Sequence, residues 1–464
     1  MNKSSVTFTV FLFAFLFNSC ANQLPPSGGK DDTDPPQIIY IFPKPNSTNI
    51  KGNSIVFKFN EYVDRRSFEE SFYISPAKGN TYSFDWSGKE VELTFNKNFD
   101  REKTYVIVIG KDFKDVRGGN KITSPVQFAF STGSKLDSGK LSGKIFSDSY
   151  DRVKVMAYFN KDETGGFPDP AKSLPDYITQ VTPDGIYEFT NLPEGRFRIY
   201  AIRDEDRNNL YSGEPDKIAL LPEDIKLSGD SNFVSNLNFI LNLPGNDVRS
   251  PAFLKSLKPD SADHIYTNKN DNNNFIIPGH RFYFYFKNKT PDKKNIVDNF
   301  KIADTATGKI YKPVFNWIND SLLEVFTLET PEYNSVISVS VDLSETDLKY
   351  RYKVYYKVYG REKFGKISGR IDISEFIYPV VIKLYDLSDK NVSYGTVLTD
   401  TSGFSIDNIL EGKYLLFAFI DENSDGEFYR GNVFPFKPPE KYIIYDNDFE
   451  IKGNSVKENI ILGF

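Results

Sequence analysis

The 464-residue sequence predicts an all-β protein built from tandem β-sandwich modules. Short runs of alternating apolar and polar residues, such as 54–59 and 91–95, recur between Gly, Ser and Asn turns, a pattern typical of sandwiches. Phe (41) and Tyr (28) are abundant, and both favour the half-buried surface of a strand. No long amphipathic helix is predicted, although residues 64–72 and 291–299 can each form one or two helical turns. The length exceeds a single core and predicts three or four domains.

An internal duplication organises the chain. Residues 192–209 and 409–426 match without a gap, so that Gly195 aligns with Gly412 and Asp204 with Asp421 at one offset of 217 (412 − 195, 421 − 204). Each copy predicts a strand that is entered through a glycine turn and left through an acidic loop. Eighteen positions in step indicate a duplicated unit.

Charge and cysteine content exclude several classes of function. The net charge of −6 gives no reason to expect nucleic acid or an anionic membrane surface as partner. Cys20 is the single cysteine, and His264 and His280 are the two histidines. An internal disulfide, a zinc-finger spacing and a Cys/His nucleophile pair are therefore excluded.

The N-terminus predicts an export signal and an anchor. Lys3 supplies a positive charge, and the apolar run 6–17 that follows is shorter than the roughly 20 residues that span a bilayer. Residues 1–19 are therefore interpreted as a signal peptide. The stretch 16–21, Leu-Phe-Asn-Ser-Cys-Ala, resembles a bacterial lipoprotein box, which implies that Cys20 is lipidated; Phe17 and Asn18 depart from the family pattern. The alternative is an ordinary cleaved signal with an incidental cysteine.

Residues 20–35 predict a flexible tether because they are rich in Pro, Gly and Asp and poor in apolar side chains. The run 20–36 resembles the start of Bacteroidota-type lipoproteins with Ig-like domains, which implies a lipid-anchored protein of the cell outer membrane. Residues 21–23 are neutral, so the periplasmic face and the cell surface both stay open.

The first module (36–134) carries short strands and the segments 43–46, 57–64, 86–88, 118–120 and 128–133. At these residues it resembles the bacterial Ig-like domain of S-layer-type and Bacteroidota surface proteins, a spacer or adhesive module with no active site. The third module (250–360) repeats some of these features, and the only two tryptophans, Trp86 and Trp317, fall at equivalent places. It is interpreted as a diverged Ig-like sandwich with an unclear opening strand.

The second module (138–243) and the fourth module (364–464) share a Gly-x-Leu/Ile-x-Gly frame, at 139–143 and 365–369. With the segments 184–189 and 192–195, and with 402–406 and 410–412 in the later copy, they resemble the transthyretin-like, carboxypeptidase-regulatory domain. That resemblance implies a small seven-stranded sandwich without catalysis of its own.

The two acidic loops are the candidate metal sites. Asp421, Asn423 and Asp425 stand at positions 1, 3 and 5 of a loop, Gly426 at position 6 supplies the sharp turn, and Glu427 offers a further oxygen. This is the first half of an EF-hand-type calcium loop, but position 12 is an asparagine and no helices flank it. The alternative is an Asx-turn, in which these side chains accept hydrogen bonds from their own backbone.

The upstream loop offers a weaker candidate calcium site. Asp204, Asp206 and Asn208 occupy the corresponding positions, and asparagine replaces the glycine; Glu214 and Asp216 follow. The same Asx-turn alternative applies. Calcium is the only cofactor that the sequence suggests.

No catalytic residue is predicted. The histidines are interpreted as surface or turn residues, and Ser142-Gly143 lacks the strand–elbow–helix context of a hydrolase. The tyrosine-rich run 350–359 is interpreted first as a half-buried strand, with an exposed sugar-binding platform as the alternative. Paired carboxylates are plentiful, but the module plan leaves no room for a glycosidase barrel.

These features predict a non-enzymatic cell-envelope lipoprotein that acts as a scaffold or protein-interaction module. Expected partners are the membrane, through the lipid, and other envelope proteins; a small-molecule substrate is not expected. The alternative is an accessory lipoprotein that binds carbohydrate or protein for nutrient capture or adhesion.

Overall fold

The computed structural model describes residues 31–464 except 77–80, 163, 230–231, 243–250, 260–264, 269–273, 288–291, 347, 389–392, 401 and 446–448. The chain divides into two compact units, 1–74 with 79–136 and 75–78 with 137–464. The prediction of an all-β fold is confirmed, because strands far outnumber the short helices. Among the described residues, no helix is both long and apolar enough to cross a membrane.

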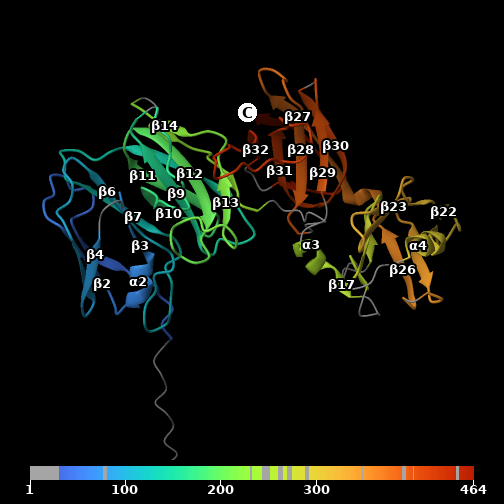
Figure 1. The fold of residues 1–464 in the computed structure, drawn as a ribbon, viewed down its shortest axis with the longest axis horizontal. Helices are drawn as coiled ribbons and strands as arrows, with labels where there is room; N and C mark the ends of the chain where they lie inside the picture. Colours follow the sequence, from blue (N-terminus) through green and yellow to red (C-terminus); the bar gives the residue numbers. More distant parts are fainter. Residues whose placement is uncertain are drawn as a thin grey trace, which may run out of the picture. The chain divides into compact units, whose positions relative to one another are not determined.

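The first module consists of two sheets, with the strand orders β1-β2-β5-β4 and β3-β6-β7 (Figure 1). Its elements are β1 (Ile38–Phe42), β2 (Ser54–Phe59), α2 (Arg65–Ser71), β3 (Phe72–Ser75), β4 (Tyr82–Ser87), β5 (Glu90–Phe95), β6 (Thr104–Ile109) and β7 (Val126–Ser131). The Asp64 carboxylate caps α2 by accepting a hydrogen bond from Ser67 N at 2.7 Å. Phe57 and Phe68, both fully buried, pack edge-to-face at 5.3 Å in the core.

The third module repeats this plan. Its elements are α3 (Pro251–Ser256), β17 (Lys258–Pro259), β18 (Ile265–Thr267), β19 (Phe275–Ile276), β20 (Phe282–Phe286), α4 (Lys293–Asn299), β21 (Phe300–Asp304), β22 (Ile310–Tyr311), β23 (Pro313–Trp317), β24 (Leu322–Thr327), β25 (Val336–Leu343) and β26 (Tyr350–Val358). The order β18-β20-β24-β23 matches β1-β2-β5-β4, and Asp292 caps α4 as Asp64 caps α2. The opening strand that the sequence left unclear is β18, which β17 flanks.

The second and fourth modules also share one plan. The second contains β8 (Gly139–Phe146), β9 (Val153–Asn160), β10 (Tyr177–Gln180), β11 (Ile186–Leu192), β12 (Gly195–Arg203), β13 (Lys217–Leu220), β14 (Ile225–Leu227), β15 (Phe233–Val234) and β16 (Phe239–Ile240). The fourth follows the short 3₁₀ helix η2 (Arg361–Lys363) and contains β27 (Phe364–Asp372), β28 (Val380–Asp386), β29 (Ser393–Leu398), β30 (Gly403–Leu410), β31 (Gly412–Ile420), β32 (Tyr442–Ile444), β33 (Phe449–Ile451) and β34 (Val456–Gly463). The order β10-β9-β12-β13 corresponds to β29-β28-β31-β32, and β11-β8-β15 to β30-β27-β34.

The repeated glycine frame has a steric cause. A Cβ added at Gly143 would lie 2.1 Å from the carbonyl oxygen of Leu237, and one added at Gly369 would lie 2.1 Å from that of Ile460. In both copies the neighbouring backbone belongs to the segment that pairs in parallel with the first strand, β8 or β27. Glycine is therefore required by the close approach of two backbones.

The second and fourth modules are in direct contact within the larger unit, although the third separates them in sequence. The hydroxyl of Tyr442 on β32 donates to the carbonyl oxygen of Leu220 on β13 at 3.2 Å. Alternating sequence patterns predicted the separate sandwiches and did not predict this pairing.

Candidate functional site

The upstream acidic loop begins where β12 ends, at the fully buried Asp204. Its Oδ1 accepts a hydrogen bond from Asn208 N at 3.2 Å, and its Oδ2 accepts one from Asn209 N at 3.0 Å. Asn209 adopts a left-handed conformation (φ 60°) at the place where the other loop has glycine. The aspartate therefore ties the turn to the end of the strand.

Lys154, on the neighbouring strand β9, supplies a cation to this loop. Its Nζ lies 2.7 Å from Asp204 Oδ2 and 2.6 Å from Asn209 Oδ1, and the lysine is only 5% exposed. The pairing of β12 with β9 sets this position, since Ile202 stands opposite Lys154. A buried carboxylate needs a partner of opposite charge, and here the chain provides its own.

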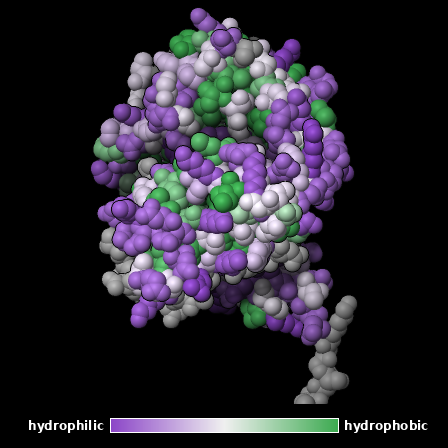
Figure 2. Space-filling model, turned by 90° about the vertical axis from the view of Figure 1, so that its right-hand side faces the viewer, coloured by the Kyte–Doolittle hydropathy of each residue, from purple (hydrophilic) through white to green (hydrophobic). Residues whose placement is uncertain are grey.

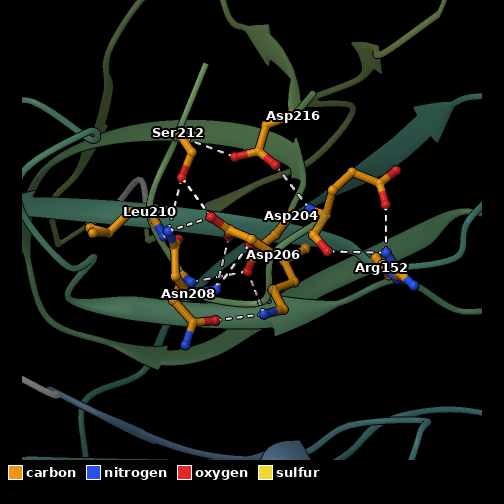
Figure 3. A network of polar contacts seen from close by, with 10 residues as sticks. Arg152, Asp204, Asp206, Asn208, Leu210, Ser212 and Asp216 are labelled. Carbon is orange, nitrogen blue, oxygen red and sulfur yellow. Dashed lines mark hydrogen bonds and ion pairs between the residues drawn. The ribbon is translucent and has the colours of Figure 1, made fainter. Parts of the chain in front are cut away.

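Asp206 and Asp216 complete the upstream network (Figure 3). Asp206 Oδ2 accepts from Ser212 Oγ at 2.9 Å, and Asp216 accepts from Glu205 N and Ser212 N at 2.9 and 2.8 Å. Burial raises the pKa of Asp206, but hydrogen bonds led by that of Ser212 outweigh it, and the pKa lies below its ordinary value. Carboxylate oxygens of Asp204, Asp206 and Asp216 lie within 4.8 Å of one another. The sequence placed Asp216 after the loop and did not predict that it joins the network.

The downstream loop repeats these hydrogen bonds. Asp421 accepts from Asp425 N at 3.2 Å and from Gly426 N at 2.9 Å, as Asp204 does from Asn208 and Asn209. Asn423 Oδ1 also accepts from Asp425 N, at 3.1 Å, and Asp425 Oδ1 accepts from Glu427 N at 2.7 Å. These contacts are the ones that the Asx-turn alternative requires.

Two features distinguish the downstream loop. Val381 stands opposite Phe419, the residue equivalent to Ile202, so a valine occupies the position of Lys154. Glu440, which the sequence did not single out, takes the place of Asp216: it is 4% exposed and accepts from Glu422 N and Tyr429 N at 3.0 and 2.8 Å.

The pKa of Glu440, the residue that takes the place of Asp216, is raised above its ordinary value. Burial raises the pKa of Glu440, and the nearby carboxylates of Asp421 and Asp425 raise it further against the opposing N–H donors. The Glu427 carboxylate points to a different partner, the Lys383 ammonium at 3.4 Å.

The calcium hypothesis stays a prediction for both loops. The oxygens of Asp421, Asn423 and Asp425 are used as acceptors for the loop's own backbone, and the same holds for Asp204, Asp206 and Asn208. Over the described ranges, the downstream loop does not place three carboxylates within 4.8 Å of one another, whereas the upstream loop does.

A third carboxylate group lies in the first module and was missed by the sequence analysis. Asp115, 1% exposed, accepts from Gly118 N and Gly119 N, each at 2.7 Å. Carboxylate oxygens of Asp115, Asp32 and Glu61 lie within 4.8 Å of one another. Burial raises the pKa of Glu61, and its two acidic neighbours add to this. An aspartate three residues before a Gly-Gly turn is the signal that could have indicated it.

The histidine prediction holds in part. His280 N donates to Ile277 O at 3.2 Å in a turn, but the ring packs edge-on against Phe282 at 4.9 Å, and burial lowers its pKa to about 4. Its described polar neighbour is the Asn268 amide at 3.5 Å, which is not a nucleophile. The signal peptide, Cys20, residues 21–30 of the tether and His264 lie outside the described residues.

The tyrosine-rich run forms the strand β26, and three of the four tyrosines on this strand face the core. Tyr350, Tyr352 and Tyr356 are each 2% exposed, and the hydroxyls of the last two lie 2.6 Å apart. The half-buried strand is confirmed. The exposed platform is wrong for Tyr350 and Tyr352, because alternation along the strand directs both side chains inward; Tyr355 points outward.

A groove of about 590 Å³ lies between the third and fourth modules. It is lined by residues from both: Ile277, Pro278, Thr330, Pro331, Glu332, Tyr333, Phe364, Tyr394 and Asn408. The Tyr333 hydroxyl donates to Asn408 Oδ1 at 3.0 Å, and its ring packs edge-to-face on Phe364 at 5.4 Å.

Figure 2 shows one side of the molecule as mainly hydrophilic, with apolar residues in separate patches.

Comparison with known families identifies the first module. Residues 32–132 match the bacterial Ig-like domain family, which confirms the resemblance predicted for this part of the chain. The match covers less than half of the chain, so it assigns these residues alone. A search of curated proteins gave no match.

Solved structures gave only remote likenesses. They include the N-terminal part of the bacterial S-layer protein SbsC (15% identity, 40% of this chain and 44% of that one, TM-score 0.16). Others are an L,D-transpeptidase from Mycobacterium smegmatis (16%, 45% and 90%, 0.17) and the major pilin subunit BcpA of Bacillus cereus (9%, 71% and 99%, 0.16). The chain spans less than half of the S-layer fragment, and TM-scores this low carry no argument about function.

Proposed function

We propose that this chain is a lipid-anchored cell-envelope protein with a structural or protein-interaction role and without catalysis. The observation that carries the proposal is the Ig-like first module, which heads a chain of two-sheet modules. In the described part of the chain, the buried acidic residues at the loops serve to tie backbone turns, and His280 has no nucleophile beside it. Among the described residues of these loops and around His280, none forms a nucleophile–base–orienter set.

In this proposal, a lipid on Cys20 anchors the chain to the outer membrane of the cell envelope. Acyl chains on this cysteine contribute about 0.8 kcal/mol for each buried methylene, so two or three chains hold the protein stably. The Pro- and Gly-rich segment 20–35 then works as a spacer between the bilayer and the first module. Envelope proteins are the expected partners, and their identity is best found by cross-linking in the native envelope followed by mass spectrometry.

Replacing Cys20 with serine tests the anchor. We expect the wild-type chain to incorporate a palmitate label and to sediment with membranes, and Cys20→Ser to lose the label and to appear in the soluble fraction. Ser19→Ala, which keeps a small residue before the cysteine, is the matched control and should behave as the wild type. A serine variant that still sediments with membranes and carries the label would contradict the assignment.

A second candidate function is carbohydrate binding in the groove between the third and fourth modules. The groove combines the rings of Tyr333 and Tyr394 with the polar groups of Glu332 and Asn408, and its volume of about 590 Å³ suits a short glycan. Aromatic faces with a few placed polar groups are the usual means of binding sugars. This candidate makes the chain an accessory binding lipoprotein.

A glycan array with the full chain separates the two candidates. Carbohydrate binding predicts a saturable hit that weakens about tenfold in Tyr333→Ala, which corresponds to about 1.4 kcal/mol. Tyr355→Ala is the control, because Tyr355 is exposed on β26 and does not line the groove. The scaffold role alone predicts no saturable hit; an equal loss in both variants would remove the groove from consideration.

A further inference from the structure

The downstream loop differs from the upstream loop in length as well as in charge. Asp204 and Asp216 are 12 residues apart (216 − 204), whereas Asp421 and Glu440 are 19 apart (440 − 421), so the fourth module carries seven additional residues here. Asn432 and Lys437 form an isolated bridge that folds the added segment back on itself. Asp421 and Glu440 therefore lie at the two ends of a longer loop in the fourth module.

The tip of this longer loop is apolar and packs on the second module. Val433 and Phe436 lie against a buried cluster on the outer face of the second module's five-stranded sheet: Met156, Tyr158, Tyr200, Ile202 and Leu220. All five residues of this cluster are at most 5% exposed. This face of the sheet is covered jointly by Phe167 and Tyr211 of its own module and by the loop from the fourth module.

A cation fixes where the tip lies. The Arg198 guanidinium is 3.5 Å from the centre of the Phe436 ring, and it also lies over Phe167 at 4.7 Å. Asp224 holds the same guanidinium through two hydrogen bonds of 2.7 and 2.9 Å. Arg198 is thus oriented by its own module before it meets Phe436, which favours a specific contact.

The fourth module contributes a second contact through β31. Tyr414, Leu416 and Ala418 point into that module's own core. The alternate residues Leu415, Phe417 and Phe419 are also buried, in a cluster with Ile240 and Phe146 of the second module.

Polar contacts close this second interface. The hydroxyl of Tyr442 donates to Asn238 O at 2.8 Å and to Leu220 O at 3.2 Å. Lys441 and Glu223 form an ion pair at 2.7 Å. Both faces of β31, the strand at the centre of this contact, are therefore buried, one on the fourth module's own core and one on the second module.

We propose that residues 427–442 are a clasp, which joins the second and fourth modules into one cooperative body and makes the third module an insert held at both ends. The chain leaves the second module near residue 242 and enters the fourth module at residue 364. This role rests on the proposed function: for a chain anchored at Cys20 with a partner on the fourth module, load passes between the second and fourth modules through this contact and not through the insert.

Hydrogen exchange of the full chain at increasing urea concentrations tests the clasp. The urea dependence of the opening free energy scales with the surface exposed on opening. In the wild type, core peptides of the second and fourth modules should share one slope, which is about twice that of the third-module peptides. Phe436→Ala removes the contact at the loop tip and leaves the contact through β31 in place. The shared opening of the two modules should therefore become about tenfold more frequent in this variant.

Phe434→Ala is the matched control, since Phe434 lies in the same loop tip, is 66% exposed, and meets the exposed Lys172 of the second module, whose Nζ is 5.2 Å from the ring centre, instead of the buried cluster. It should leave the frequency of the shared opening unchanged. Wild-type second and fourth modules that open independently would overturn the proposal, as would equal effects of the two phenylalanine variants. Retained exchange protection in the third module of Phe436→Ala shows that the variant chain still folds.

Discussion

Lys154→Met is expected to destabilise the second module by about 3–5 kcal/mol. Lys154 and Asp204 are 5% and 0% exposed, and their side chains meet at 2.7 Å. Removing one partner of such a pair leaves an uncompensated buried charge, which costs far more than the pair itself contributes. Methionine keeps the length of the side chain, so the loss reports charge and not a cavity. Urea-dependent hydrogen exchange of second-module peptides measures it.

Two comparisons make this result specific. Lys140→Met removes the same charge from an exposed position of β8 and should change stability by less than about 0.5 kcal/mol. Lys154→Met with Asp204→Asn should recover part of the loss, because the remaining side chain is neutral. A single variant as stable as Lys140→Met would show that the pair contributes nothing.

The same variant extends the calcium hypothesis to the upstream loop. Without the ammonium, three carboxylates whose oxygens lie within 4.8 Å of one another lack the cation that the structure supplies. Millimolar calcium should therefore raise the melting temperature of Lys154→Met more than that of the wild type. An equal response of both proteins would mean that the lysine does not stand in for a metal.

Gly369→Ala and Gly143→Ala are expected to destabilise their modules by about 2–3 kcal/mol each. The added methyl group would stand 2.1 Å from a backbone carbonyl oxygen in both copies, and backbone cannot yield as a flexible side chain does. Overpacking of this kind typically costs about 1–3 kcal/mol, and here it also separates two paired strands. Hydrogen exchange of β27 and β34 peptides, or of β8 and β15 peptides, measures the effect.

Gly166→Ala is the control for this pair. Gly166 has no atom within 4 Å of an added Cβ, and its backbone is not left-handed. The substitution should be neutral or slightly stabilising, by up to about 1 kcal/mol, because alanine restricts the unfolded chain. If Gly369→Ala were equally mild, the repeated frame would need an explanation other than close approach.

The strands and helical turns that were predicted correctly are those that depend on sequence patterns within a few residues. Alternation in residues 54–59 and 91–95 predicted strands that form as β2 and β5, since each depends on neighbours within a few residues. The short helical turns expected at 64–72 and 291–299 form as α2 and α4 for the same reason, because an aspartate caps each one. The tyrosine-rich run was ambiguous, and burial of Tyr352 against the core decided between its two interpretations.

The candidate site was predicted in outline and completed by distant residues. Asp204 and Asp421 were found because their turns are written in consecutive residues, and the backbone hydrogen bonds follow from that spacing. Glu440 was missed because nineteen residues separate it from Asp421, and no local pattern links the two. Lys154 was missed because it reaches the loop across a strand pair.

The sequence by itself determined the all-β class, the duplicated strand and acidic turn, and the glycine frame. The first two features depend on alternation and turn chemistry, which a short stretch of residues specifies. The glycine frame was visible in the sequence as a repeat, but its steric cause is backbone far along the chain, at Leu237 and Ile460. Only the tertiary structure decided that a lysine neutralises one acidic loop while valine stands at that place in the other, and that the second and fourth modules pack together. Strand register and the fold of a seven-residue insertion set those contacts, and both act between residues far apart in the chain.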